Sequence, residues 1–390
     1  MSDTRTPRID DLDRLVSELH QIAPVASEPV ADETPDLADW LRQVRDQDRS
    51  DLLLVTALPP VVRVKGHVSK LRGEALGAEE IESALSPLLP ARLRERYRDG
   101  EAIDLAFTIK GLGRFRLNLH RERGRAAAAI RALPMRIPRL SELHFTHDIA
   151  MLAELPRGLV LVCGPTGSGK TTTLAALIAE INARHARHIV TVEDPIEYEH
   201  SHGRSVIEQV EIGIDAPDFP TALRAAVRQA PDVIVVGEMR DPETMRIALA
   251  AAETGHLVLA TVHATDAAAA VSRIADAFAV ERQNAVRQEL AMALAAILTQ
   301  SLVQTRAASL VPVAELLLVG YGARQHIRKN ALQHLNQEVT ITRKAGSFTL
   351  EESLARLVAA GTLDRSDAML RAAHPEELES LLRAGEPRTP

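Results

Sequence analysis

The chain has 390 residues, of which 46% are hydrophobic and 25% are charged. This length and balance predict a globular protein of two or three domains and exclude a chain too polar to form a core. The single cysteine, Cys163, excludes an internal disulfide framework and a four-cysteine zinc module, a pattern that fits a reducing compartment.

The net charge of −7 is unevenly distributed along the chain. Residues 1–50 contain 6 Lys/Arg against 12 Asp/Glu, whereas residues 110–139 contain 9 Lys/Arg against Glu122 alone. A basic band on a mildly acidic protein indicates either an anionic partner or a solvated face.

The first residues predict a loosely attached extension. Apolar residues recur at helical spacing from Ile9 to Ile22 in an acidic background, which predicts a short amphipathic helix. The prolines Pro24, Pro29 and Pro35 then predict a linker. Residues 1–35 therefore form a separate segment in this interpretation. We expect no secretory signal, because no basic segment followed by an apolar core opens the chain.

Residues 36–155 predict an α+β domain with its own core. Alternating apolar residues on both sides of Lys110–Gly113 predict an antiparallel hairpin. The remaining pattern predicts helices near Leu37–Val44 and over Ala78–Tyr97, the latter interrupted at Pro87 and Pro90, and strands over Leu52–Leu58 and Val61–Val68.

Residues 156–390 predict an α/β domain. Alternating strands and helices predict a parallel sheet that is covered on both faces. From about Ala267 the pattern is mostly helical, with one strand at Val313–Val319. The uncharged run Leu290–Thr305 predicts a buried helix, because it is too short and too polar for a membrane span, and we expect no transmembrane segment. The predicted parallel strands are Leu159–Cys163, His188–Val192, Val233–Val236 and Leu257–Val262.

The stretch Gly164–Thr171 matches the phosphate-loop pattern G-x-x-x-x-G-K-S/T in full, and it lies between a predicted strand and a helical run. Its glycines let backbone N–H groups point at phosphate oxygens, next to the positive end of a helix. Lys170 can reach the β- and γ-phosphates of ATP, and the Thr171 hydroxyl can ligate Mg²⁺. The predicted nucleotide-binding residues are Gly164, Pro165, Thr166, Gly167, Ser168, Gly169, Lys170, Thr171 and Thr172.

Two carboxylates complete the predicted hydrolytic site. Glu238 follows an apolar strand in the Walker B arrangement. Because Gly237 takes the usual aspartate position, Glu238 is the only carboxylate of this motif, and it is predicted to act through the Mg²⁺ shell or through the attacking water. Glu193 ends another strand and is predicted to orient the water. The nearby Asp194 and Glu197 are equally well explained as loop caps or ion-pair partners.

His256 and His263 bracket the strand Leu257–Val262. Seven residues of extended chain place them about 23 Å apart at a rise of ~3.3 Å, which excludes a shared metal. His263 lies at the carboxyl edge and is predicted to contact the γ-phosphate, whereas His256 is left open between a structural and a functional role.

The basic band has three explanations. Nucleic-acid binding normally adds stacking aromatic residues, and only Phe115 is present. Alternatively, some arginines enter a neighbouring subunit's nucleotide site as trans fingers. A solvated strand face remains the simplest reading of any one of them. The band consists of Arg114, Arg116, Arg121, Arg123, Arg125 and Arg131.

With these motifs in place, the chain resembles the secretion ATPase superfamily and, within it, the PilT-like type IV pilus retraction ATPases. The resemblance covers about Asp36–Leu382. Phosphate loops alone are common, but four boxes in this order are specific. The boxes are Gly164–Thr172, Val192–Tyr198, Val236–Asp241 and Thr254–His263.

The resemblance implies a RecA-like P-loop ATPase domain over residues 156–390 and a smaller PAS-like domain over residues 36–155. It implies a cytoplasmic homohexamer, peripheral at the inner-membrane base of the pilus, whose domains sandwich ATP and drive an inner-membrane platform protein on hydrolysis. The segment Arg114–Arg131 is similar to the family's arginine-bearing region, which favours Arg116 and Arg131 as the trans fingers.

Two departures from the family pattern leave an accessory retraction ATPase as an alternative. Gly322–Ile327 stands where the family has Ala-Ile-Arg-Asn-Leu-Ile, and Ser50–Leu54 stands where it has Ser-Asp-Leu-His-Leu. An extension or type II secretion ATPase typically carries a four-cysteine zinc module, and a chain with one cysteine cannot form it. Met239 in the box Val236–Asp241 also favours the retraction branch.

Two further classes are less well supported by the residues. A nucleic-acid translocase is favoured only by the basic band, so we expect no direct nucleic-acid partner. A non-hydrolysing assembly component is disfavoured by the intact Lys170, Thr171, Glu193 and Glu238.

Overall fold

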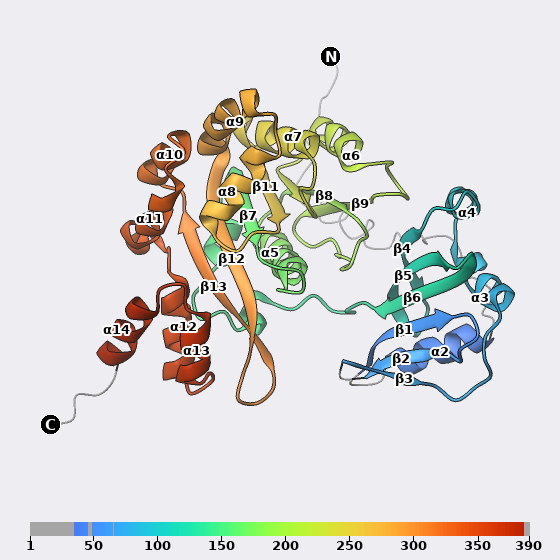
Figure 1. Cartoon of the computed structure of the whole chain (residues 1–390). Helices are drawn as coiled ribbons and strands as arrows, with labels where there is room; N and C mark the ends of the chain where they lie inside the picture. Colours follow the sequence, from blue (N-terminus) through green and yellow to red (C-terminus); the bar gives the residue numbers. More distant parts are fainter. Residues whose placement is uncertain (1–34, 46–48, 65, 386–390) are drawn as a thin grey trace, which may run out of the picture. The chain divides into compact units, whose positions relative to one another are not determined.

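A computed structural model of the chain describes residues 35–45, 49–64 and 66–385. The helix and linker predicted within residues 1–35 lie outside this range, except for Pro35. The chain divides into two compact units, Met1–Ile103 with Phe107–Ala132 and Asp104–Ala106 with Leu133–Pro390 (Figure 1). We call these the first unit and the second unit.

The first unit is built on a six-stranded sheet with the order β3-β2-β1-β6-β5-β4. From residue 113 to residue 120, strand β5 alternates between buried and half-exposed residues, so that Phe115 and Leu117 face the core while Arg116 points to the other face. The predicted hairpin is confirmed as β4 and β5, and the predicted strand over residues 61–68 is two paired strands, β2 and β3. The elements are α2 (Pro35–Val44), β1 (Arg49–Val55), β2 (Val61–Val64), β3 (His67–Lys70), α3 (Ala78–Leu85), α4 (Ala91–Arg98), β4 (Ile103–Ile109), β5 (Gly113–Glu122) and β6 (Arg125–Ala132).

The second unit is built on a seven-stranded sheet with the order β13-β12-β7-β11-β10-β8-β9. Every neighbouring pair is parallel except β12 with β13. The predicted α/β class is therefore confirmed. The strands are β7 (Gly158–Cys163), β8 (His188–Glu193), β9 (Val206–Glu211), β10 (Val233–Val236), β11 (Leu257–Val262), β12 (Leu294–Gln304) and β13 (Leu310–Leu318).

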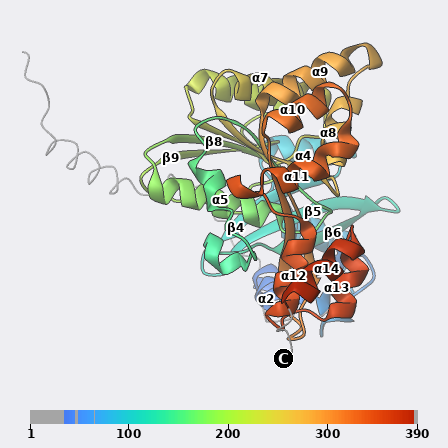
Figure 2. The same ribbon diagram turned by 90° about the vertical axis from the view of Figure 1, so that its left-hand side faces the viewer.

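Helices cover both faces of this sheet, as parallel strands require. One face packs against α6 to α9, and the opposite face packs against α5 and the short turn η3 (Ala150–Glu154). The helices α12 to α14 gather in a group (Figure 2), and their apolar residues pack with Val303, Val311 and Val313 of β12 and β13 in a separate cluster. The helices are α5 (Lys170–Arg184), α6 (Phe219–Ala226), α7 (Pro242–Glu253), α8 (Ala267–Asp276), α9 (Val280–Ala293), α10 (Tyr321–Arg328), α11 (Leu335–Ile341), α12 (Leu350–Ala359), α13 (Arg365–Arg371) and α14 (Pro375–Gly385).

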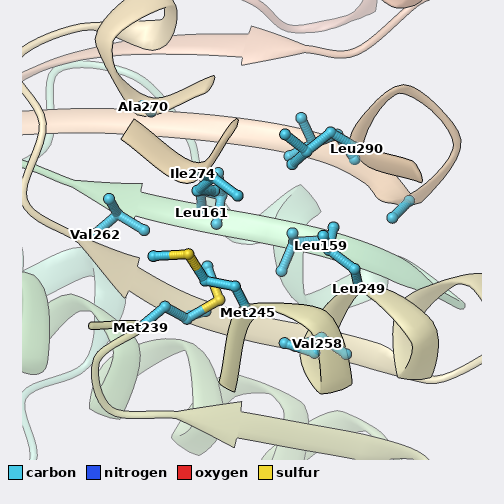
Figure 3. Packing of buried hydrophobic residues seen from close by; sticks show 14 of the residues in the cluster. Leu159, Leu161, Met239, Met245, Leu249, Val258, Val262, Ala270, Ile274 and Leu290 are labelled. Atoms are coloured by element: carbon cyan, nitrogen blue, oxygen red, sulfur yellow. The ribbon is translucent and has the colours of Figure 1, made fainter. Parts of the chain in front are cut away.

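Strand β7 lies in the middle of the core. Leu159 and Leu161 point to the face covered by α7 to α9, where Met245 and Ile274 pack near them (Figure 3). Val160 points to the opposite face, toward α5. All six residues of β7 are buried, which fixes the position of the loop that follows it.

The prediction of a buried helix over Leu290–Thr305 is wrong. Helix α9 ends at Ala293, and the remainder is strand β12, which pairs with β7 on one side and β13 on the other. A strand buried on both faces shows no alternation, so its apolar run looks like that of a buried helix. The edge strand β9 was not predicted from the sequence. No helix in the described part of the chain is long and apolar enough to cross a membrane.

Candidate nucleotide site

The phosphate loop connects the end of β7 to the start of α5 and has the conformation that its glycines were predicted to allow. Gly169 lies in the left-handed region at φ +86° directly before α5 begins at Lys170. Gly164 has φ +150°, and a Cβ atom there would fall on the carbonyl oxygen of Gln300 and on the Ser168 hydroxyl. A side chain at residue 164 is therefore excluded by contact as well as by conformation.

A strand that the sequence analysis missed supports the loop. Gln300, a buried residue of β12, donates a hydrogen bond of 2.7 Å from Nε2 to the carbonyl oxygen of Ser168. This contact could not be predicted while residues 290–305 were assigned to a helix. Gln300 therefore helps to hold the phosphate loop in its conformation.

Lys170 points back into the loop. Its Nζ atom donates to the carbonyl oxygens of Gly164 at 3.0 Å and Pro165 at 2.9 Å. Burial lowers the pKa of Lys170, and the nearby Glu238 and Cys163 partly oppose this shift. The ammonium group thus lies at the mouth of the loop, where a phosphate oxygen would meet it.

His263 joins Lys170 to Glu238. Its Nδ1 atom lies 3.4 Å from Lys170 Nζ, and its Nε2 atom lies 3.2 Å from Glu238 Oε1. This cluster forms because β10 and β11 are neighbouring parallel strands and their carboxyl ends meet at the same edge as the end of β7.

Glu238 has a second cationic neighbour. Arg240 lies 2.8 Å from its Oε2 atom. Burial alone would raise the pKa of Glu238, but the hydrogen bond and charge of Arg240, together with His263 and Lys170, outweigh it and hold the pKa below its usual range. Glu238 is therefore ionised at neutral pH.

Glu193 ends β8, the strand next to β10. Its Oε1 atom accepts hydrogen bonds from Thr191 Oγ1 at 2.6 Å and Gln209 Nε2 at 3.0 Å. Burial raises the pKa of Glu193, against the effect of these two donors, and Glu197 and Glu211 add to the rise. A carboxylate with a raised pKa is a better proton acceptor than an exposed one.

Gly237 has a packing role at this edge. Its N–H donates to the Val192 carbonyl at 2.8 Å. A Cβ atom at residue 237 would lie 3.2 Å from that oxygen and 3.3 Å from Glu193 Cα. The close approach of the ends of β8 and β10 accounts for glycine at the usual aspartate position.

The other predicted residues fall into three groups. Thr172 is in the first turn of α5, and its hydroxyl lies 3.0 Å from the Tyr198 hydroxyl. His256 Nδ1 lies 2.9 Å from the Ala251 carbonyl of α7. Arg116 and Arg131 are cross-strand neighbours on β5 and β6 of the first unit, and Arg131 Nε donates to Asp51 Oδ1 at 2.8 Å.

The oxygen donors present suit Mg²⁺ rather than a transition metal. Within the described ranges, no group of three or more His, Cys, Asp and Glu could hold a metal ion. Mg²⁺ is usually held by one or two protein oxygens together with phosphate oxygens and water. The hydroxyl of Thr171 and the carboxylate of Glu238 are protein oxygens of this kind beside the phosphate loop.

Comparison with known proteins gives a consistent answer. The family model described as "Type II/IV secretion system protein" matches residues 126–369. The chain is 36% identical over 341 residues to the type IV pilus retraction ATPase PilT of Pseudomonas aeruginosa, covering 87% of this chain and 99% of that protein. It is 35% identical over 346 residues to the type IV pilus ATPase PilU of the same species, covering 88% and 91%.

The fold agrees with this relationship. A crystal structure of the pilus retraction motor PilT with bound ADP superimposes with a TM-score of 0.79 at 36% identity, covering 89% of this chain and 99% of that one. The chain therefore belongs to the type II/IV secretion system protein family and, within it, to the PilT-like retraction ATPases.

Proposed function

We propose that this chain is a motor ATPase that hydrolyses ATP to power retraction of a type IV pilus. The observation that carries the proposal is the cluster of Lys170, His263 and Glu238 at the end of a complete phosphate loop. The likeness to PilT along nearly the whole of both chains supports the pilus as the object that is moved.

The residues divide the work of binding and hydrolysis. The N-terminal turn of α5 and the loop amides hold the phosphates, and Lys170 neutralises the terminal ones. Mg²⁺, when bound with ATP beside Thr171 and Glu238, supplies charge that polarises the γ-phosphate. His263 keeps the Lys170 ammonium and the Glu238 carboxylate in fixed positions relative to each other.

Glu193 is the proposed acceptor of a proton from the attacking water. The terminal phosphate is then transferred to that water, with ADP as the leaving group. The raised pKa of Glu193 supports this role, because a general base works best when its pKa approaches the operating pH.

We further propose a homohexamer in which Arg116 and Arg131 of one subunit reach the γ-phosphate held by its neighbour. Support comes from their pairing on adjacent strands, which presents two guanidinium groups on one sheet face. A positive charge of this kind stabilises the transition state of phosphoryl transfer.

The motor would work in the cytoplasm at the base of the pilus, against a platform protein of the inner membrane. Retraction returns pilin subunits to that membrane, so the force has to be applied there. If arginines of the basic band contact the nucleotide of a neighbouring subunit, the band is explained without a nucleic-acid partner.

An accessory retraction ATPase is the second candidate, favoured by the segment Gly322–Ile327, which lies within α10 and departs from the family pattern. A Cβ atom at residue 322 would fall on the carboxylate of the buried Glu338. His326 Nε2 lies 3.4 Å from Glu338 Oε1, so this segment makes a polar contact through a histidine where the family pattern has leucine.

Gene deletion in the native host separates these functions. Excess surface pili with loss of twitching are expected for a retraction motor. Normal twitching that fails only under load indicates an accessory motor, and absent pili indicate extension and would contradict the proposal. A purified full-length protein that shows no ATP hydrolysis would contradict the enzymatic part.

A further inference from the structure

Gln209 on the edge strand β9 uses its whole side-chain amide in one network. Its Nε2 atom donates to Glu193 Oε1 at 3.0 Å and to the Tyr198 carbonyl at 2.9 Å. Its Oε1 atom accepts from the His200 N–H at 2.8 Å. An amide with both N–H groups and its oxygen engaged has one orientation, so it fixes whatever it holds.

The network leaves one oxygen of Glu193 for chemistry. Oε1 accepts both hydrogen bonds that the carboxylate receives, from Thr191 and Gln209. Among the described residues, no donor is recorded for Oε2. A carboxylate whose one oxygen takes two donors keeps the other oxygen as the open proton acceptor.

The same network reaches the phosphate loop through Tyr198. Its carbonyl accepts from Gln209, while its hydroxyl lies 3.0 Å from Thr172 Oγ1 in the first turn of α5. Gln209 thus connects Glu193 with the helix that begins at Lys170, through three hydrogen bonds and the intervening residue Tyr198.

We propose that Gln209 is a positioning residue for hydrolysis, which holds Glu193 with Oε2 open and ties this carboxylate to the phosphate-loop helix through Tyr198. The proposal rests on the proposed role of Glu193 as the group that accepts the water's proton. Gln209 itself touches neither nucleotide nor water in this scheme.

The charges around Glu193 show why a neutral donor is needed at residue 209. Glu197 and Glu211 raise the pKa of Glu193, whereas the hydrogen bonds from Thr191 and Gln209 lower it. Without the Gln209 donor, the pKa of Glu193 rises further and the carboxylate is held by Thr191 alone. Both changes reduce the fraction of molecules that present an ionised oxygen to water.

The test uses the full-length protein and Gln209→Met, which keeps the length of the side chain and removes its hydrogen bonds. We expect kcat for ATP hydrolysis to fall ~10- to 100-fold, while KM for ATP stays within ~3-fold. The acid limb of the kcat profile is expected to move to higher pH, which lost packing alone would not cause. Glu208→Gln, at the adjacent exposed position of β9, is the matched control and should leave kcat within ~2-fold.

Unchanged kcat and an unchanged pH profile in Gln209→Met would overturn the proposal. If this variant does not fold, Gln209→Glu replaces it, with the same loss of kcat and upward shift expected and the same contrary result. Glu193→Gln tests the proposed role of Glu193 separately: wild-type turnover in that variant refutes that role, whereas a strong loss in Glu193→Gln beside a normal Gln209→Met refutes only the positioning proposal.

Discussion

His263 Nε2 lies 3.2 Å from Glu238 Oε1, and the opposite nitrogen of the same ring lies 3.4 Å from Lys170 Nζ. One imidazole therefore joins the lysine of the phosphate loop to the carboxylate that follows β10. The two groups come from strands separated by β11, so the histidine at the end of β11 is the side chain placed to span them.

His263→Asn should lower kcat about 100-fold, because the shorter side chain cannot bridge Lys170 and Glu238. Steady-state ATP hydrolysis of the purified protein measures this. His256→Asn is the control, since the His256 side chain lies 2.9 Å from the Ala251 carbonyl and 3.4 Å from Thr254 Oγ1, at the opposite end of β11 from His263, and its kcat should stay within ~2-fold. Equal losses in the two variants would show that the bridge has no specific role.

Lys170→Ala should abolish turnover, with a loss of about 10³-fold or more, because the phosphate charge loses its cationic partner. Binding of a fluorescent ATP analogue should weaken as well. Retained activity would remove the assignment of the whole site to nucleotide binding.

Glu238→Gln should bind ATP but hydrolyse it about 100-fold more slowly. The amide keeps the size of the side chain and loses the charge that faces Lys170 and the metal. Equilibrium binding and single-turnover hydrolysis separate the two effects. A variant with normal turnover would rule out the role of Glu238 in the chemical step.

The trans arginines can be tested by mixing subunits. Lys170→Ala and Arg131→Ala are each expected to be inactive, whereas mixed rings should recover activity where an intact loop meets an intact arginine. Arg116→Ala is tested in the same way, and Arg123→Ala, an exposed residue beside β5, is the control that should stay active alone. No recovery in any mixture would argue against shared sites.

Glu315 on β13 predicts a pH-dependent stability. Burial, with the charges of Glu351, Asp266 and Glu377, raises its pKa from 4.5 to about 7. The folded state therefore holds the proton of the Glu315 carboxyl more tightly than the unfolded state does. The contribution of Glu315 to the free energy of unfolding is fully present below pH 4.5 and is lost as the pH rises through about 7.

Glu315→Gln should therefore be more stable than the wild type above pH 7, by roughly 1–3 kcal/mol in the free energy of unfolding. Urea unfolding at pH 5 and pH 8 measures the difference. Glu281→Gln, an exposed position on α9, serves as control. The same change with pH in the wild type and in Glu315→Gln would contradict the assignment.

The sequence was sufficient for the parallel strands that carry the site, because each combines a short apolar run with a motif at its carboxyl end. Lys170, Glu193, Glu238 and His263 could be placed at one sheet edge by that rule alone. The identity of their mutual contacts required coordinates, since strand order is not visible in a single sequence.

The supporting residues escaped prediction for two different reasons. Gln300 lies on a strand buried on both faces, whose apolar run resembles a helix. Gln209 lies on an edge strand whose mixed polar pattern gave no clear signal, although residues 206–210 include three β-branched residues. Both glutamines act through long-range contacts that local patterns do not encode.

The bare backbone at Gly237 has a consequence for how this site tolerates change. An aspartate there would require the end of β8 to shift by a few tenths of an ångström, since its Cβ would press on Val192 O and Glu193 Cα. Restoring the commoner Walker B aspartate would thus displace Glu193, the proposed acceptor of the water's proton. In this chain, the substitution that brings the motif closer to its usual form would distort the site.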